Sequence, residues 1–524
     1  MQTFRHHSRP VSPDVSTQYR WLFAAIFVIW LAFTFRMVNL DSAPLYIDET
    51  TYIHYAEQIL NHEGAFRSRT TLMQPFLIAV FQPHGTEAPL VGRMVTVLAS
   101  ALAVASCLQL GRLLGGKRAG LLAALLYAVV PIALFHERQA LSDPVASALS
   151  LTALTIAIWQ IRRPRIALSI GGGLLLGLAY LVKLSALLFI PLSLLAPLLL
   201  PRRPAWRALA YNMLSAGLGV ALGLAGLAVA TQQGYVQQAT VGGALSLLRL
   251  GPAGISSVLS ANAAELKALT GAYFGWYALI IAGGGLALAA TGRRSRAFLF
   301  TAGGVLILSL PWLIQQYLYT LPGRYVMTMP SFVVLLMALT LSTGLALVPR
   351  KWAPLIGAIV LVPVLGRWLA FNAAIPWDTQ AVPLPPGESA LYQSGWEAGN
   401  AYREAARDLL AEWEAGNRAP LNTMTYGGCC YWQTTVYLGP EVGQHAFLEP
   451  GKQELLADWL AAGHTVFIID THQTRFDGEV EDWLGAEVEH FNSYTHGLTQ
   501  LDVYRVVGAH GQLAEEIEQR AEQP

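Results

Sequence analysis

Charged residues are scarce in this chain. Lys, Arg, Asp and Glu make up 13% of its 524 residues, about half of the ~25% that is usual in soluble domains. Apolar residues make up 54%, and the mean hydropathy is +0.43. This balance excludes a disordered chain, a collagen-like chain and an ordinary soluble enzyme.

Cysteine is scarcer still, with three residues in all, which excludes a disulfide scaffold. Cys429 and Cys430 are adjacent, which disfavours an ordinary disulfide between them. Cys107 lies in an apolar run, so we expect free or partly oxidised thiols. The histidines near the C-terminal end lack ligand spacing, which favours surface positions over a metal site. They are His445, His464, His472, His490 and His496.

Acidic residues are unevenly distributed along the chain. Residues 21–370 hold 24 Lys or Arg and 9 Asp or Glu, a net charge of +15, whereas residues 371–524 hold 7 and 23, a net charge of −16. Two parts that differ this much in charge and hydropathy are expected to form separate domains in different surroundings. We therefore expect a membrane domain over 21–370, preceded by a cytoplasmic segment over 1–20, and a soluble domain over 371–524.

Apolar runs dominate the first of these parts, and a membrane helix takes ~20 such residues. The sequence predicts eleven membrane helices: 21–40, 90–111, 119–135, 144–161, 167–182, 184–200, 210–230, 271–291, 297–316, 326–348 and 353–370. The fifth and sixth share one apolar run that Lys183 interrupts, so two short helices are favoured over one long crossing. Glycines at 171–173, 217, 219, 223 and 283–285 suit close helix packing.

The connections between these runs alternate in charge. Five of them hold 14 basic residues and no acidic residue, and basic loops stay on the cytoplasmic side. These residues are Arg112, Lys117, Arg118, Arg162, Arg163, Arg165, Arg202, Arg203, Arg207, Arg293, Arg294, Arg296, Arg350 and Lys351. We therefore expect a multi-pass protein of the plasma (inner) membrane, with a cytoplasmic N-terminus, a long outer loop over 41–89 and the C-terminal domain outside.

The C-terminal part opens on a proline-rich linker and then favours a mixed α/β domain. Helices are predicted at 397–415, 451–462 and 511–523, and strands at 422–426, 431–438, 465–470 and 498–507. The expected fold class is an all-α polytopic membrane domain followed by a small extracytoplasmic α/β domain.

Two of the expected outer loops concentrate ionisable side chains. Asp48 and Glu49 begin an amphipathic stretch that contains Tyr52, and a carboxylate there could take a proton from an acceptor or hold a metal ion. The second loop places Glu137 and Asp143 between two apolar runs, where charges are often functional. For Asp48 and Asp143 the alternative of a plain helix cap stays open.

Basic residues stand on the same expected side. Lys183 is the only charge in about 35 residues, Arg324 precedes the tenth span beside Tyr325, and Arg93 opens the second span. Together such cations suit an anionic lipid headgroup, because Lys and Arg bind phosphate. Each alone is also explained as a cation that reaches up to the membrane surface.

Taken in order, these residues resemble bacterial GT-C class glycosyltransferases. The resemblance is to family 39 and the aminoarabinose-transferase-like group, which are related to the protein O-mannosyltransferases, and it covers about residues 20–350. The matching pieces are Asp48-Glu49 with Tyr52, Gln74-Pro75 followed by Arg93, Arg138 to Pro144, Gly177 to Lys183, Gly323-Arg324-Tyr325 and, in some bacterial members, Ser394 to Gly399. Many relatives carry a His where this chain has Gln74, which cannot act as an acid or base.

The resemblance implies an enzyme that moves one sugar from a polyprenyl-phosphate donor to a lipid, glycan or protein acceptor on the outer face. It implies Asp48 as the catalytic base, with Glu49 as its neighbour, and it places Glu137 and Asp143 in the same cavity. The implied ligands of the donor phosphate are cations: Lys183, Arg324, Arg93 and Arg138. Two tyrosines complete the implied site: Tyr52 and Tyr325.

Two other functions fit parts of the pattern. A lipid or glycan transporter or flippase would place ionisable groups at mid-membrane, whereas the charges here gather at the expected outer rim. A scaffold or sensor would leave the rim acids without a role. No spacing in the sequence demands a cofactor, and the need for a divalent cation stays open, with Asp48 and Asp143 as its candidate ligands. The expected partners are the donor, the acceptor and membrane lipid, without nucleic acid.

Overall fold

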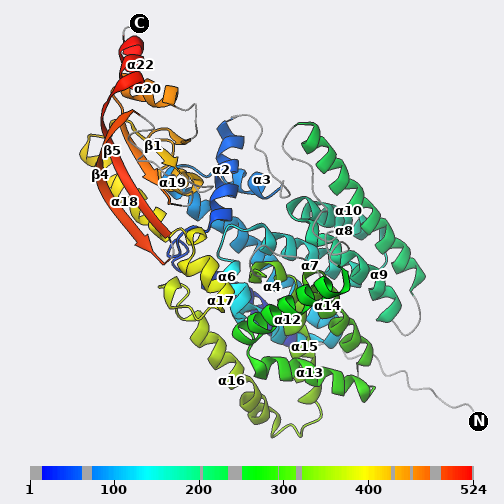
Figure 1. Ribbon diagram of the computed structural model, residues 1–524. Helices are drawn as coiled ribbons and strands as arrows, with labels where there is room; N and C mark the ends of the chain where they lie inside the picture. The colour runs from blue at the N-terminus through cyan, green and yellow to red at the C-terminus, as the bar shows by residue number, and fades with distance from the viewer. Residues whose placement is uncertain are drawn as a thin grey trace, which may run out of the picture.

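The computed structural model describes residues 15–61, 73–200, 205–233, 251–292, 294–313, 321–426, 431–448, 453–472, 485–497 and 499–521. The expectations for segment 1–14, Arg202, Arg203, Arg293 and Cys429-Cys430 lie outside these residues. The described chain forms a large helical part followed by a smaller part that contains a sheet (Figure 1).

Helices make up the described chain as far as residue 372, apart from short connections. They are α1 (Val15–Met37), α2 (Ile47–Asn61), α3 (Met73–Ala79), α4 (Ala88–Gly115), α5 (Lys117–Val129), α6 (Pro131–His136), α7 (Ser142–Gln160), α8 (Ile166–Val182), α9 (Phe189–Leu199), α10 (Trp206–Gln232), α12 (Gly251–Tyr273), α13 (Trp276–Ala290), α14 (Ser295–Leu313), α15 (Met329–Gly344) and α16 (Ala353–Asn372). Two short 3-10 turns matter for the site: η2 (Leu184–Leu188) and η3 (Gly323–Val326).

Six of the described helices are long and apolar enough to cross a membrane, and the pair α12–α13, bent by 105°, would make a seventh. Each of the eleven predicted spans falls on helices, but α8, α9 and α15 have only 17, 11 and 16 residues. A membrane protein with several apolar helices is therefore confirmed, whereas eleven crossings stay a prediction. The predicted break at Lys183 is confirmed, because α8 ends at Val182 and Lys183 has an extended backbone.

Glycines bring α8 and α10 close together, as the sequence predicts for 172–173, 219 and 223. A Cβ atom on Gly173 would press against Leu218 of α10, and one on Gly219 would press against Leu176 of α8. Because glycine has only a hydrogen atom in place of a side chain, the backbones of α8 and α10 can approach closely, as is common between membrane helices.

Acidic and basic connections lie at opposite ends of the same helices. Helix α7 has Asp143 in its first turn and Arg162 just after its end. Helix α4 has Arg93, which pairs with Glu49, near its start and Arg112 in its last turn. We call these the carboxylate end and the arginine end of the helical part.

The second part is built around a five-stranded mixed sheet with the order β2-β1-β3-β5-β4. Its strands are β1 (Leu421–Tyr426), β2 (His445–Phe447), β3 (Thr465–Asp470), β4 (Ala486–His496) and β5 (Thr499–Ala509). Strand β1 runs parallel to β2 and β3, and β5 runs antiparallel to β3 and β4. The helices of this part are α17 (Pro386–Ser389), α18 (Asn400–Ala415), α19 (Tyr431–Leu438), α20 (Gln453–Ala461) and α22 (Gly511–Ala521).

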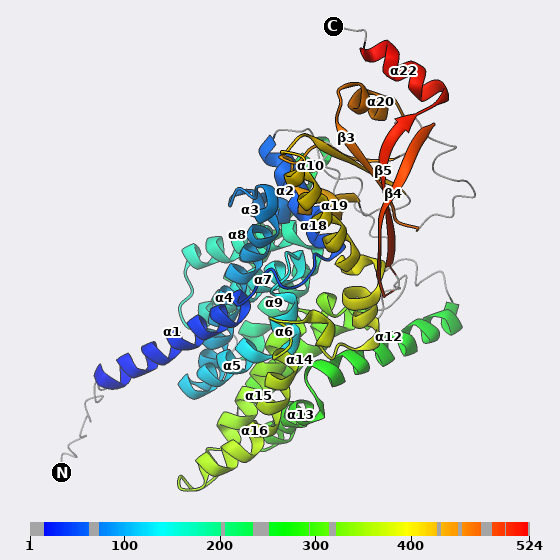
Figure 2. The same ribbon diagram turned by 90° about the vertical axis from the view of Figure 1, so that its left-hand side faces the viewer.

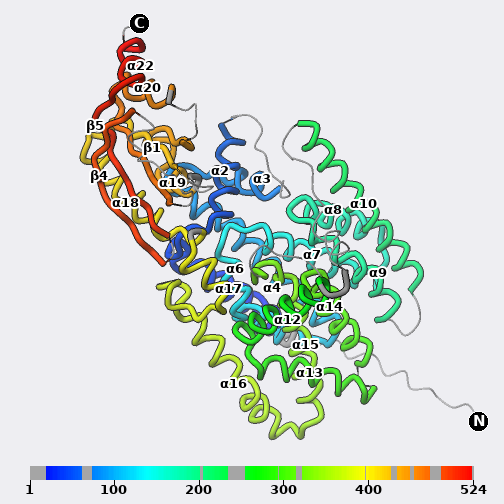
Figure 3. The backbone as a smooth tube through the Cα atoms, in the orientation of Figure 1, coloured from blue at the N-terminus to red at the C-terminus, as the bar shows by residue number. Residues whose placement is uncertain are grey.

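Helices cover both faces of the sheet, so this part has three layers. Successive residues of β3 alternate between the faces: Phe467 packs with Leu409 of α18, and Ile468 packs with Leu456 of α20. The mixed α/β character that the sequence predicts is confirmed, as Figure 3 shows along the chain trace.

Two expectations for this part are wrong, and two strands were missed. Residues 431–438 form helix α19, not a strand, and strands β2 and β4 were not predicted. His445 is half-buried and not a plain surface residue: its Nδ1 lies 2.9 Å from Thr423 Oγ1, and burial lowers its pKa to about 4.

The second part docks on the carboxylate end of the helical part, where α2 and α3 lie (Figures 1 and 2). Helix α19 packs on α2. The Leu45 amide donates to the Tyr437 hydroxyl at 2.6 Å, and Gln433 Nε2 donates to the Leu45 carbonyl at 3.2 Å. Arg403 Nη1 donates to the Ser42 carbonyl at 2.7 Å.

Candidate active site

Two acid–cation pairs meet at the carboxylate end. Asp48 lies in the first turn of α2 and Asp143 in the first turn of α7, so each carboxylate stands at a helix N-terminus, where the helix dipole favours negative charge. Arg324 Nη1 lies 2.5 Å from Asp48 Oδ2, and Lys183 Nζ lies 2.5 Å from Asp143 Oδ1. Four of the predicted site residues thus come together from four separate segments.

The ring of Tyr325 joins the two pairs. Lys183 Nζ lies 4.5 Å and Arg324 Cζ 5.2 Å from its ring centroid, distances at which a ring attracts a cation. The ring also stacks on Trp312 at 5.5 Å. Because η3 carries both Arg324 and Tyr325, this short turn places Arg324 beside the ring that Lys183 also faces.

The four charged side chains differ in burial. The side chains of Arg324 and Asp143 are 8% and 6% exposed, whereas those of Asp48 and Lys183 are 39% and 19% exposed. Arg324 Nε is buried and has no hydrogen-bond partner among the residues that the structure describes. Such a donor is costly to leave unpaired, so it suits an anion that arrives with the substrate.

Tyr52 ties the two carboxylate-bearing helices together. Its hydroxyl lies 3.3 Å from Ser142 Oγ, at the start of α7 and next to Asp143. The contact fixes α2 against α7, and with it the spacing of Asp48 and Asp143.

Glu49 does not share the surroundings of Asp48. It is fully buried and takes two hydrogen bonds from Arg93, at 2.8 and 2.9 Å. It also accepts from the backbone amides of Tyr46 at 3.0 Å and Ala140 at 2.7 Å. Both of its carboxylate oxygens thus accept two hydrogen bonds from the protein itself, as is typical of a carboxylate with a structural role.

Arg93 is equally committed, since its remaining donors go to the carbonyls of Leu40, Ala43 and Pro44 at 2.8, 2.9 and 3.0 Å. It is 1% exposed. Because every donated bond goes to the protein itself, Arg93 shapes segment 40–49 and has no donor left for a substrate phosphate.

Glu137 and Arg138 also turn inward. Glu137 accepts from Arg36 Nε at 2.6 Å and from the Tyr127 hydroxyl at 2.7 Å. Arg138 donates to backbone carbonyls at the end of α1, among them Val38 and Asn39 at 2.7 Å each. Of the charged residues predicted for the site, those that stay available to a substrate are Asp48, Asp143, Lys183 and Arg324. Asp143 is the one that comes from the predicted second outer loop.

Sequence reasoning missed Glu397, which the second part brings to this site. The Tyr46 hydroxyl donates to Glu397 Oε2 at 3.1 Å, and the Tyr46 ring centroid lies 4.9 Å from Arg324 Cζ. Burial raises the pKa of Glu397 above its usual range, although Tyr46 and Arg324 act to lower it. The signal was present in the Ser394 to Gly399 motif, but nothing in the sequence links it to Asp48.

Glu388 was missed as well, and it holds η3 in place. Its carboxylate accepts from the Gly323 amide at 2.6 Å and from the Tyr273 hydroxyl at 2.7 Å, and it lies 3.1 Å from His136 Nε2. Burial acts to raise the pKa of Glu388, but His136 and these hydrogen bonds outweigh burial and hold it below its usual range.

Metal binding finds little support in the donor set. Within the described part of the chain, no three His, Cys, Asp or Glu side chains are placed to share an ion. Asp48 and Asp143 each already face a cation.

This arrangement can be compared with known proteins. A family model described as dolichyl-phosphate-mannose-protein mannosyltransferase matches residues 69–229. Among solved structures, ArnT from Cupriavidus metallidurans in the apo state has a TM-score of 0.53 and 12% identity, over 95% of this chain and 100% of that chain. The fold is that of a GT-C glycosyltransferase.

Other comparisons agree on this GT-C fold. The oligosaccharyltransferase of Archaeoglobus fulgidus in the apo form has a TM-score of 0.54 and 11% identity, over 87% of this chain and 70% of that chain. A structure of ArnT from Cupriavidus metallidurans bound to undecaprenyl phosphate has a TM-score of 0.51 and 12% identity, over 96% and 99% of the two chains. No curated protein matches the sequence. The chain thus shares its fold with ArnT and, over residues 69–229, matches the family model of the mannosyltransferases.

Proposed function

We propose that this chain transfers a single sugar from a polyprenyl-phosphate donor to a lipid, glycan or protein acceptor, with Asp48 as the base. The observation that carries the proposal is the pair of cations, Lys183 and Arg324, which both face the ring of Tyr325 and each pair with one of the two acids. Support for the donor comes from ArnT, whose structure is known with undecaprenyl phosphate, and from the archaeal oligosaccharyltransferase in complex with dolichol-phosphate.

In the proposed step, Asp48 takes the proton of the acceptor hydroxyl or amine as its oxygen or nitrogen bonds to the anomeric carbon of the sugar. The bond between that carbon and the phosphate oxygen breaks, and its electron pair leaves with the polyprenyl phosphate. Lys183 and Arg324 stabilise the negative charge that develops on this leaving group.

The ion pairs suggest an order of binding. Arg324 Nη1 faces Asp48 in the structure, and a carboxylate held by a cation is a weaker base. A donor phosphate that binds Arg324 competes with Asp48 for the guanidinium. Donor binding therefore releases the Asp48 carboxylate for the acceptor, and we infer that the donor binds first.

No step of the proposal passes through a metal ion, because both candidate carboxylate ligands already have cationic partners. The proposal places the carboxylate end on the outer face of the inner membrane and the arginine end in the cytoplasm, by the distribution of basic loops. It includes eleven crossings, a cytoplasmic N-terminus and an extracytoplasmic domain over residues 371–524.

The experiment is release of free polyprenyl phosphate by the purified full chain from a panel of polyprenyl-phosphate sugars, with a membrane extract as the acceptor source. We expect release from one donor of the panel. Asp41→Asn serves as the matched control, because Asp41 is an exposed acid of the same segment.

Release by wild type and by Asp41→Asn, but not by Asp48→Asn, supports the proposal. No release from any donor by folded protein, or equal release by Asp48→Asn, would contradict it. In that case transport of the lipid-linked sugar across vesicle membranes becomes the function to test.

A further inference from the structure

A groove between α4 and α7 opens at the arginine end, far from Asp48 and Asp143 along the same helices. It has a volume of about 530 Å³ and is lined along α4 from Leu102 to Leu113, along α7 from Thr152 to Trp159, and by Arg162 and Arg163 in the turn that follows α7. A second hollow of about 600 Å³ adjoins it, shares Leu113 and Arg162 with it, and adds Arg294 and Arg296.

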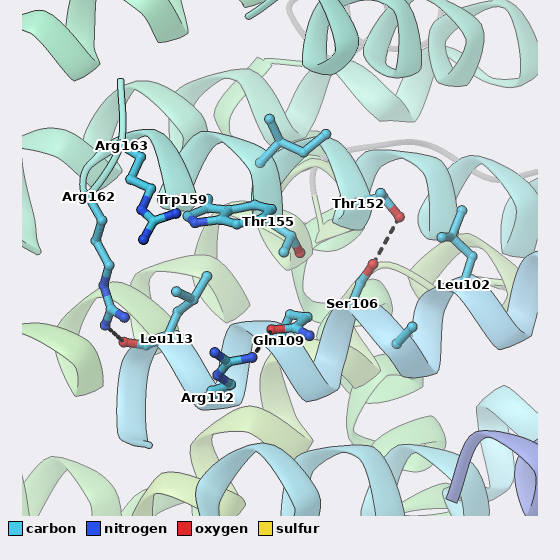
Figure 4. A pocket seen from close by; sticks show the side chains of 12 residues that line it. Leu102, Ser106, Gln109, Arg112, Leu113, Thr152, Thr155, Trp159, Arg162 and Arg163 are labelled. Atoms are coloured by element: carbon cyan, nitrogen blue, oxygen red, sulfur yellow. Dashed lines mark hydrogen bonds between the residues drawn. The ribbon is translucent and has the colours of Figure 1, made fainter. Parts of the chain in front are cut away.

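The groove is strongly polarised (Figure 4). Arg112, Arg162 and Arg163 stand at one end, whereas Ser106 and Thr152 stand toward the other. Neither hollow has an acidic residue among the described residues that line it. Among the described residues, none of these three arginines forms an ion pair with a carboxylate, so three positive charges face the mouth uncompensated.

The arginines keep free donors. Arg162 Nη2 donates to the Leu113 carbonyl at 2.8 Å, and Arg112 Nη1 donates to Gln109 Oε1 at 3.3 Å. A guanidinium has five N–H donors, so most of the donors at this end stay open to an anion. All three side chains are exposed.

The hydroxyl groups in the deep part of the groove already have hydrogen-bond partners within the protein. Thr152 Oγ1 donates to the Ala148 carbonyl at 2.8 Å and lies 2.9 Å from Ser106 Oγ, while Thr155 Oγ1 donates to the Leu151 carbonyl at 2.8 Å. The hydroxyl protons are thus used within the helices. What remains is an apolar wall that includes Leu102, Ile156 and Trp159.

The length of the groove fits one leaflet of a bilayer. Leu102 and Arg112 are ten positions apart on α4, and Thr152 is ten positions before Arg162, which follows the end of α7. At 1.5 Å per residue, each stretch is about 15 Å long. The hydrocarbon core of a bilayer is ~30 Å thick, so half of it is also about 15 Å.

We propose that this groove binds one anionic glycerophospholipid of the adjacent leaflet. Its phosphate lies among Arg112, Arg162 and Arg163, and an acyl chain runs along Trp159 toward Ser106. Basic pockets between membrane helices are a common form of lipid recognition. This leaflet is the cytoplasmic one in the orientation proposed above, but the binding itself does not depend on the sugar-transfer proposal.

The test is native mass spectrometry of the delipidated full chain, titrated with phosphatidylglycerol or with phosphatidylcholine that has the same acyl chains. We expect the first phosphatidylglycerol to bind at least tenfold more tightly than phosphatidylcholine. The triple variant Arg112→Gln, Arg162→Gln, Arg163→Gln should lose this preference. The matched control Arg207→Gln, Arg350→Gln, Lys351→Gln removes three charges from other basic connections and should keep it.

A second variant, Ala105→Trp, fills the groove without changing its charge. It should weaken phosphatidylglycerol binding by a similar factor, and it keeps the test decisive if the triple variant does not fold. Three results would overturn the proposal: equal binding of both lipids, loss of binding in the charge control as well, or full binding by Ala105→Trp. Displacement of phosphatidylglycerol from the groove by undecaprenyl phosphate would also overturn it, since the occupant would then be the polyprenyl carrier.

Discussion

The Asp48 side chain is 39% exposed and faces one guanidinium, whereas Glu49, one residue later, is fully buried and accepts four hydrogen bonds. A buried carboxylate with four donors contributes to stability, while an exposed one beside a single cation is free to exchange partners. Of these two neighbouring acids, Glu49 therefore stabilises the fold, whereas Asp48 is available to a substrate.

We expect Glu49→Gln to lower the free energy of unfolding by about 3–5 kcal/mol, because it leaves the Arg93 charge buried without the carboxylate that pairs with it. Asp48→Asn should lower it by less than Glu49→Gln, because the Asp48 carboxylate is 39% exposed and solvent screens its pair with Arg324. Thermal unfolding of both variants in the same detergent checks this. Equal stability of the two would contradict the division of roles.

Lys183 is proposed to bind the donor phosphate, so Lys183→Gln should weaken binding of undecaprenyl phosphate by about 10–100-fold. That factor corresponds to the ~1.5–3 kcal/mol of a hydrogen bond to a charged group. Lys183→Arg should recover part of it. Lys267→Gln, on an exposed face of α12, is the control. Unchanged affinity in Lys183→Gln would remove Lys183 from the site.

The raised pKa of Glu397 predicts a pH effect. As the pH falls, this carboxyl takes up its proton earlier than an ordinary Glu, and it then loses its charged hydrogen bond with Tyr46. Glu397→Gln should therefore lower kcat/KM by about 3–10-fold at neutral pH, or ~1 kcal/mol, and move the acid limb of the pH profile to lower pH.

The profile of Glu397→Gln is to be compared with that of Glu404→Gln, an exposed acid of α18 that should behave as wild type. An acid limb that stays at the same pH in Glu397→Gln would mean that Glu397 does not titrate in the catalytic range.

At the scale of elements, hydropathy located the helices well because membrane spans need long apolar runs. It failed in the second part for physical reasons. Residues 431–438 are rich in Tyr, Thr and Val, which favour strands, but packing on α2 and α18 makes them a helix. Strand β4 is the edge strand, and register shifts at Glu487/Val488 and His490/Asn492 interrupt the apolar alternation that would reveal it.

The same limit applies to the site. Charge type and position along the chain pointed to Asp48, Asp143, Lys183 and Arg324, because these stand at helix ends near apolar runs. The burial of Arg93 against Glu49, 44 residues away, depends on tertiary packing that no local pattern records. The contact of Tyr46 with Glu397 spans 351 residues and was equally invisible.

At the scale of the whole molecule, the sheet-containing second part contributes a residue, Glu397, to the candidate site. Gly399 adopts a φ of +76°, and a Cβ there would press on the Leu45 carbonyl. This close approach holds Glu397 against the segment that carries Tyr46 and Asp48.

We expect Gly399→Ala to lower both stability and sugar transfer. Gly463→Ala is the matched control, because Gly463 has a φ of +73° but open space around it. In both variants the left-handed backbone lowers the free energy of unfolding by about 1–2 kcal/mol. Thermal unfolding should therefore show a further loss of stability only in Gly399→Ala. Equal losses would mean that the contact with Leu45 does not couple the two parts.

The most direct test of the proposed chemistry measures donor binding and sugar transfer in the same preparation of Asp48→Asn. Because the substitution removes both the base and the competitor for Arg324, we expect polyprenyl phosphate to bind as tightly as in wild type or more tightly. Single-turnover transfer should fall by about 10²–10⁴-fold, the usual contribution of a general base. Transfer at the wild-type rate, or a loss of donor binding that accounts for the whole defect, would contradict Asp48 as the base.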